Sequence, residues 1–146
     1  MKGRDSYHKG HILEYLLMRY LRFEEYRKEG ARLRDKVYNY QEGAEFTSYR
    51  EVKPIKVNLE GGREHEIDIW ARSLEEGQDL LISVKTYDRK IGRNEVEEFL
   101  RVKETAQELG IKGYYIFYSA SGFDNNAEAL LRQNEIMCAD KEIWRL

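Results

Sequence analysis

Two charged residues interrupt apolar, strand-like runs in the middle of the chain. Asp68 lies in the run 66–70, and Lys85 ends the run 81–85. Taking a charged group out of water is costly unless the group is paired or bound, so this acid and this lysine indicate a site. A carboxylate can hold a hard divalent cation, and an ammonium group can polarise water or neutralise an anion. The pair is therefore either a site for such chemistry or an ordinary surface ion pair between neighbouring strands.

The elements that must position this pair follow from hydrophobic periodicity. Apolar residues recur at helical spacing from about 11 to 28, and Gly30 is the expected end of that helix. Residues 31–45 fit either a short helix or a loop. The rest of the chain predicts strands at 55–59, 64–72 and 79–86, a helix at 92–109, a strand at 113–119, a helix at 125–134 and a strand at 136–138. The order α-β-β-β-α-β-α-β predicts an α/β fold, in which helices flank a mixed sheet made of a three-strand meander and a right-handed crossover.

Length and composition set the class of protein. At 146 residues with 41% hydrophobic residues, we expect one domain over 1–146 with its core at about 9–140. The net charge of −2 and the pI of about 6.0 exclude a protein that coats DNA without regard to sequence.

Cys138 is the single cysteine, so no intrachain disulfide can form, and a reducing compartment is expected. No apolar run is long enough for a membrane span and no signal peptide opens the chain, so the cytoplasm is the expected location. Composition leaves open whether the chain is a whole protein or part of a larger one.

Three further stretches carry a resemblance to known proteins. The chain has a Gly-x-x-x-Glu pattern from Gly10 to Glu14, a strand with a small-residue turn and a phenylalanine in 118–127, and a short strand in 133–138. With the acid and the lysine in the same order, the chain from about residue 9 onward resembles the PD-(D/E)xK restriction-endonuclease-like superfamily, and within it the Mrr-like group. The resemblance implies a DNA endonuclease that uses Mg²⁺, with Mn²⁺ as a substitute. By the same resemblance, Asp68 and the carbonyl of Val84 are expected metal ligands. Glu14 either supports a metal-bound water or is a plain solvated helix acid.

The chain departs from the family pattern at Ser83, where an acid is expected. A hydroxyl is a poor Mg²⁺ ligand, so either the activity is lost or another carboxylate replaces the missing one. Some restriction enzymes of this fold carry Ser-x-Lys and take that carboxylate from the following helix. Twelve residues separate Lys85 from Glu98, which matches that spacing, whereas Glu95 points more directly inward on a helical wheel and Glu97 points away. Each of these acids also has a plain structural explanation as a helix-start residue that interacts with the helix dipole.

Other polar residues near the site have weaker patterns. Glu66 lies two residues before Asp68 and is expected on the same face, either as a supporting or metal-binding acid or as an exposed strand residue. His65 is expected to face away from Asp68, and the histidines lack the spacing of a zinc site. Four basic residues are candidates for contacts with DNA phosphates: Lys9, Arg89, Lys90 and Arg93.

Three functions compete at this point. The first is a Mg²⁺-dependent endonuclease of the Mrr-like group, expected to act on DNA as a homodimer because cutting both strands needs two sites. The second is a nuclease fold with a decayed catalytic set, acting as a DNA-binding or assembly module. The third is a Holliday-junction resolvase, which shares the chemistry and differs in substrate.

Overall fold

The protein is described by a computed structural model over residues 2–46, 48–73 and 78–140, with the backbone alone for residues 2–11. Chain order begins with three helical elements: α1 (Lys2–Arg22), the 3₁₀ turn η1 (Glu24–Tyr26) and α2 (Arg27–Lys36). Strands β1 (Glu51–Asn58), β2 (Glu64–Arg72) and β3 (Asp79–Lys85) follow. The chain continues with α3 (Arg93–Glu108), β4 (Gly113–Ser119), α4 (Asn125–Gln133) and β5 (Met137–Asp140).

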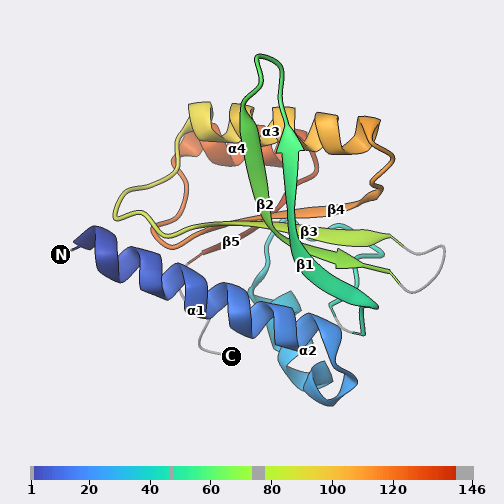
Figure 1. Ribbon diagram of the computed structural model, residues 1–146. Coiled ribbons are helices and arrows are strands. Elements are labelled where there is room, and N and C mark those ends of the chain that lie inside the picture. The colour runs from blue at the N-terminus through green and yellow to red at the C-terminus, as the bar shows by residue number, and fades with distance from the viewer. Residues whose placement is uncertain (1, 47, 74–77, 141–146) are drawn as a thin grey trace.

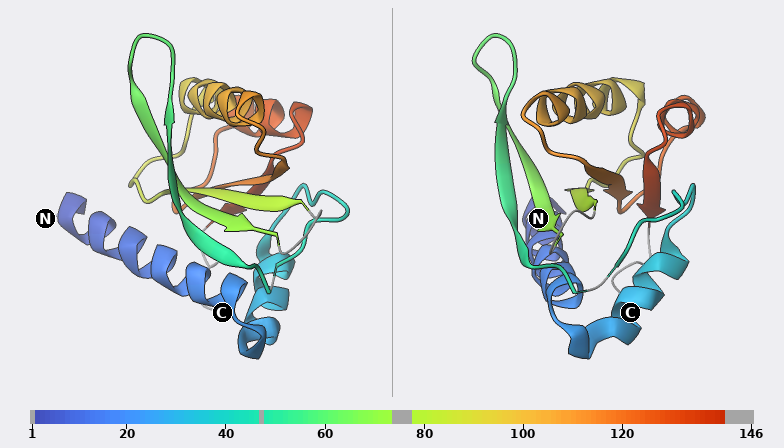
Figure 2. Two further views of the ribbon diagram at one scale, coloured as in Figure 1. Left: turned by 45° about the vertical axis from the view of Figure 1, so that its right-hand side comes forward. Right: turned by 90° about the vertical axis from the view of Figure 1, so that its right-hand side faces the viewer.

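One mixed sheet with the order β1-β2-β3-β4-β5 forms the middle layer. Strands β1, β2 and β3 pair antiparallel, whereas β3, β4 and β5 pair parallel. Figures 1 and 2 show α1 and α2 on one side of this sheet and α3 and α4 on the other. Each face has its own apolar core. Leu17 and Ile82 belong to the cluster under α1, and Phe99 and Phe117 to the cluster under α3. The predicted helix-flanked mixed sheet is confirmed.

The hairpin of β1 and β2 leaves the sheet as an arm. β1 pairs with β2 along its whole length, but β2 pairs with β3 only over Ile69–Ala71. The earlier part of β2 therefore rises with β1 beside α3, which Figures 1 and 2 show as a two-stranded projection. Gly61 and Gly62 form its tip with φ values of +83° and +78°, which glycine adopts without strain. This separation of β2 from β3 positions the candidate site.

A β-bulge lies where the arm begins. The β1–β2 register shifts between Lys53 and Ile55, around Pro54, which cannot donate to the ladder. Ile67 packs in the core under α3, whereas Ile69 packs in the core under α1. In a regular strand these two side chains would share a face. Bulges re-aim side chains in this way, and the residue between the two isoleucines is Asp68.

The structure corrects the predicted start of the chain. The first helix ends at Arg22 because Phe23 is extended (φ −102°, ψ 130°), and Gly30 lies buried inside α2 instead of ending a helix. Residues 31–45 divide into the end of α2 and a loop. β1 starts before Pro54, since the bulge accommodates the proline within the strand. The predicted turn at 75–77 lies outside the described residues. No helix in the described ranges is long and apolar enough to cross a bilayer.

Candidate active site

A pocket opens in the angle between the arm, the C-terminal end of β3 and the face of α3. Its volume of about 80 Å³ accommodates several water molecules or a hydrated ion. Polar and charged groups line its mouth, while aromatic and aliphatic side chains of the core under α3 form its floor. The lining residues are His65, Glu66, Ser83, Lys85, Tyr87, Glu95, Glu98, Phe99, Val102 and Phe117. Four of the predicted site residues therefore meet here: Glu66, Lys85, Glu95 and Glu98.

The bulge directs the carboxylate of Asp68 toward β3. Its Oδ2 accepts a hydrogen bond of 2.7 Å from the backbone N–H of Val84. Backbone pairing of β2 with β3 ends at Ile69 and Ile82, so this side chain satisfies the next N–H where the ladder stops. The contact fixes Asp68 beside the backbone between Ser83 and Lys85, whose side chains line the pocket. Ser83 is only 6% exposed, and the carbonyl of Val84 stays a predicted metal ligand.

Lys85 enters the pocket from the last position of β3, which pairs with β4 on its other side. Its Nζ lies 5.9 Å from the ring centre of Tyr87, an exposed residue on the loop that leads to α3. The hydroxyl of Ser121 donates to the backbone carbonyl of Tyr87 and anchors that loop. The ammonium group of Lys85 thus lies in a partly open pocket, where it can meet an anion that approaches from solvent.

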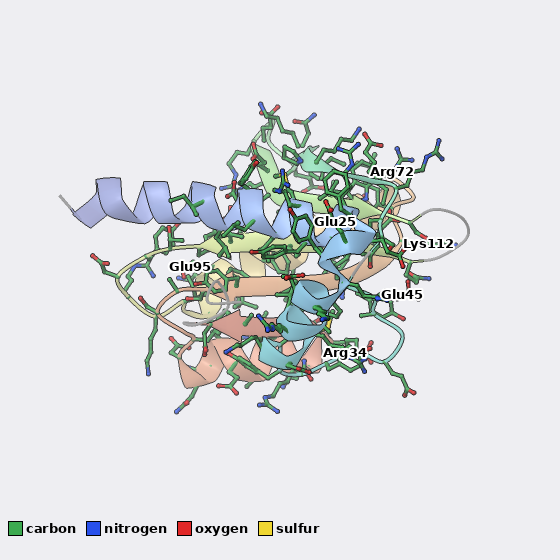
Figure 3. The ribbon with its side chains drawn as sticks, turned by 90° about the horizontal axis from the view of Figure 1, so that it is seen from below. Glu25, Arg34, Glu45, Arg72, Glu95 and Lys112 are labelled. Carbon is green, nitrogen blue, oxygen red and sulfur yellow. The ribbon has the colours of Figure 1, made fainter. Side chains whose placement is uncertain are left out.

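Two α3 glutamates face the pocket with different partners. Both oxygens of Glu95 are engaged: Oε2 accepts from the N–H of Gly92 at 3.1 Å, and Oε1 pairs with Arg89 at 2.6 Å. Figure 3 shows Glu95 at the end of the molecule opposite Arg72 and Lys112. Oε1 of Glu98 lies 2.9 Å from Nε2 of His65 and 3.1 Å from a guanidinium nitrogen of Arg63.

Glu97 has a different environment from these two acids. It does not line the pocket and pairs with Arg93 at 2.8 Å. The direction predicted for each of the three glutamates from the helical wheel is therefore confirmed.

A second acidic group lies across β2, on the side of α1. Glu14 is half-buried, and burial raises its pKa from 4.5 to about 7, with further increases from the negative charges of Asp68 and Glu66. These carboxylates therefore repel one another. Within the described residues, no three Asp, Glu, His or Cys side chains converge as a preformed metal site. A cation here would be held by one or two carboxylates, with water and substrate oxygens completing its shell, which is the usual arrangement for Mg²⁺.

The basic residues near the pocket are partly neutralised. Arg89 and Arg93 form ion pairs with α3 glutamates, whereas Lys90 is exposed on the loop before α3. Lys9 lies in α1, where the structure describes the backbone only. Of the predicted basic residues, Arg89 is therefore linked to the pocket through its ion pair with Glu95.

Two residues of the site, Arg63 and His65, have no role in the sequence prediction. Both come from β2 or the turn before it, and both contact Glu98. The signal that could have found His65 is strand pairing. The turn at Gly61 and Gly62 places His65 opposite Val57, a buried residue of the core under α3, so His65 must point toward that helix.

Comparison with known proteins agrees with this description. The family model described as "Restriction endonuclease" (Mrr_cat) matches residues 8–144. No curated protein sequence matches the chain. Among solved structures, a repair endonuclease from Pyrococcus abyssi is similar with a TM-score of 0.43 and 19% identity, over 62% of this chain and 38% of that one. An EndoMS–double-stranded DNA complex is similar with a TM-score of 0.41 and 18% identity, over 62% and 36%.

The family match spans nearly the entire chain. The chain has the restriction-endonuclease-like fold and belongs to the Mrr-type restriction endonuclease family.

Proposed function

We propose that this protein is a metal-dependent DNA endonuclease whose active site is the pocket between the arm, β3 and α3. The observation that carries the proposal is the meeting of Lys85 and Glu98 in one pocket, beside the segment of β3 that holds Asp68. Family membership supports nuclease activity. The site supports a hydrolysis in which acids and a lysine act together on a phosphodiester.

The donor set fits Mg²⁺ or Mn²⁺. Carboxylate oxygens are the ligands these hard cations prefer. The pKa of Glu14 is raised first by burial and then by the negative charges of Asp68 and Glu66, and a divalent cation would relieve the second effect. Asp68 and Glu98 would hold the ion, with the carbonyl of Val84 as a further ligand and Glu66 as a supporting acid. When bound, such an ion stabilises the negative charge that develops on phosphate oxygens.

Glu98 is the better replacement for the acid missing at position 83. Both oxygens of Glu95 are occupied by Gly92 and Arg89, so binding a metal would cost it a helix cap or an ion pair. The contacts of Glu98 with His65 and Arg63 are both made at Oε1, so a metal that approaches Oε2 would displace no helix cap. Of the two helix positions that the sequence leaves open, the contacts favour Glu98.

The remaining proposed roles belong to side chains other than the metal ligands. Lys85 lies where its ammonium can neutralise a phosphate oxygen or polarise the attacking water. Glu14 has a pKa of about 7, close to the value at which a carboxylate exchanges protons with water most effectively near neutral pH. Arg89 pairs with the pocket residue Glu95 and would contact DNA phosphates without reading base sequence, a role proposed also for Lys90 and Arg93. Lys9 is proposed to extend this contact from α1.

The test is a plasmid-nicking assay. Wild-type protein is incubated with supercoiled DNA and Mg²⁺ or Mn²⁺, alongside Asp68→Ala, Lys85→Met and the control Glu97→Gln, whose acid faces away from the pocket. We expect nicking by wild type and Glu97→Gln, and at least a hundredfold loss in the other two. Nicking that survives in Asp68→Ala refutes the assignment.

A second candidate function rests on the buried Ser83. Without an acid at this position, the fold could bind DNA without cutting it. A protein that has lost catalysis would still bind DNA in a mobility-shift assay. Calorimetry would show no heat of Mn²⁺ binding that depends on Asp68. If the protein cuts DNA, double-strand breaks that form without a nicked intermediate would favour the proposed homodimer, in which each protomer cuts one strand.

A further inference from the structure

A histidine from the arm holds the helix carboxylate that faces the site. Nε2 of His65 lies 2.9 Å from Oε1 of Glu98, and both side chains line the pocket together with Ser83. We infer that His65 is a positioning residue that fixes Glu98 for metal binding, so that a helix acid can serve in place of the acid missing at position 83. This inference rests on the proposed function and adds a residue to it.

The contact between His65 and Glu98 is made at one carboxylate oxygen, so the other oxygen can face a metal ion. Both His65 and Arg63 lie closest to Oε1 of Glu98, so a metal ion could approach at the second oxygen, Oε2. Metal-binding carboxylates are commonly held in this way, with a neighbouring group donating to one oxygen and the ion taking the other. A glutamate side chain without such a partner would spread over several rotamers and lose entropy on binding an ion.

The environment of the contact makes it stronger than an ordinary surface pair. The side chains of His65 and Glu98 are 30% and 32% exposed, so most of each lies out of water, where a polar contact to a charged group is worth more. The side chain of Arg63 is 60% exposed, so its ion pair with Glu98 is screened by water and holds the carboxylate less firmly. His65 is therefore the main partner of the two.

The backbone that carries His65 is fixed by the core. His65 pairs across the arm with Val57, which is fully buried. Val57 belongs to the same apolar cluster as Phe99, the residue next to Glu98 on α3. The arm and the helix thus form one packed unit. The histidine and the glutamate keep their relative position because the core holds both backbones, which is the arrangement that precise sites require.

The other two acids of the same helix turn lack this arrangement. Glu95 is committed to the N-terminus of α3 and to Arg89, which is 62% exposed. Glu97 pairs with Arg93 within the helix. Glu98 alone of the three is held by a residue from another element of the described structure.

The test measures Mn²⁺ binding to the metal-free protein by isothermal titration calorimetry, which needs no DNA and no turnover. His65→Leu removes the donor and keeps an apolar side chain of similar bulk, whereas His65→Gln keeps an N–H that can reach Glu98. Glu98→Gln, the double variant His65→Leu/Glu98→Gln, and the control Glu97→Gln complete the set. Far-UV circular dichroism and thermal melts confirm that each variant is folded.

We expect His65→Leu to weaken Mn²⁺ binding by about 10–100-fold, His65→Gln to recover most of the loss, and Glu97→Gln to match wild type. Because His65 acts through Glu98, the double variant should bind no more weakly than Glu98→Gln alone.

Unchanged binding in His65→Leu, together with weaker binding in Glu98→Gln, overturns the inference and leaves the proposed function standing. Losses that add in the double variant also overturn it, since His65 would then act independently of Glu98. If wild type binds no Mn²⁺, or Asp68→Ala binds as wild type does, the proposed function itself fails.

Discussion

Replacing Glu14 by glutamine should make the protein more stable at pH 8 and leave its stability nearly unchanged at pH 5. Burial, followed by the charges of Asp68 and Glu66, raises the pKa of Glu14 from 4.5 to about 7. At about 1.36 kcal/mol for each pKa unit, the upper limit of the effect is about 3 kcal/mol. Because Glu14 is only half-buried, solvent screening reduces this figure to about 1–2 kcal/mol.

The sign follows from proton binding. Between pH 4.5 and about 7 the folded protein keeps a proton on Glu14 that the unfolded chain has released. The free energy of unfolding therefore falls as pH rises through this window and stays low above it. Glutamine carries no titrating proton, so Glu14→Gln removes this decline. The difference between variant and wild type should grow from near zero at pH 5 to about 1–2 kcal/mol at pH 8.

The assay is urea denaturation followed by far-UV circular dichroism at pH 5, 6, 7 and 8, in buffer that contains a chelator. Glu25→Gln is the matched control, because Glu25 is an exposed acid at the start of η1. A gain in stability that is equal at all four pH values would refute the reasoning, since it would come from packing or helix propensity. No gain at pH 8 would show that burial and the charges of β2 do not raise the pKa of Glu14.

Three further outcomes are expected. Mg²⁺ at ten times its dissociation constant should stabilise wild type by about 1.4 kcal/mol and leave Asp68→Ala unchanged, as thermal melts with and without the metal would show. Asp124→Ala should cost about 1 kcal/mol in urea denaturation, because Oδ1 of Asp124 caps α4 by accepting from the N–H of Ala127 at 2.8 Å; an unchanged midpoint would mean that water replaces the cap. Gly113→Ala should cost about 1–3 kcal/mol, since a Cβ there would lie 2.5 Å from the carbonyl oxygen of Asp79; full wild-type stability would contradict this close approach of β3 and β4.

Local sequence patterns predicted the central part of the fold well. The strands at 64–72 and 113–119 and the helix up to Gly110 follow from alternation, apolar runs and helix-end glycines, and their observed bounds agree closely. These signals are local, because a strand or helix face is set by the spacing of residues within it. The first forty residues were predicted less well. The end of α1 and the path through Gly30 depend on how two helices pack beneath the sheet, and that packing leaves no pattern in the local sequence.

For the candidate site too, local spacing predicted some features and packing decided the others. Spacing along α3 was enough to show which glutamates face inward, since a helix has a fixed period. It could not choose between Glu95 and Glu98, because the choice depends on which partners surround each acid. Those partners, Arg89 on a loop and His65 on the arm, reach the helix only in the folded chain.

By itself, the sequence determined the order of the elements, the placing of an acid and a lysine on neighbouring strands, and the absence of the usual acid at Ser83. These features depend only on residue types and on spacings of a few residues along the chain. The tertiary structure decided the rest. A bulge at Asp68 turns that carboxylate onto the backbone of β3, and the arm separates from the sheet to open a pocket in which His65 meets Glu98. Such contacts join residues far apart in the chain, so only the packing of the arm against α3 can bring them together.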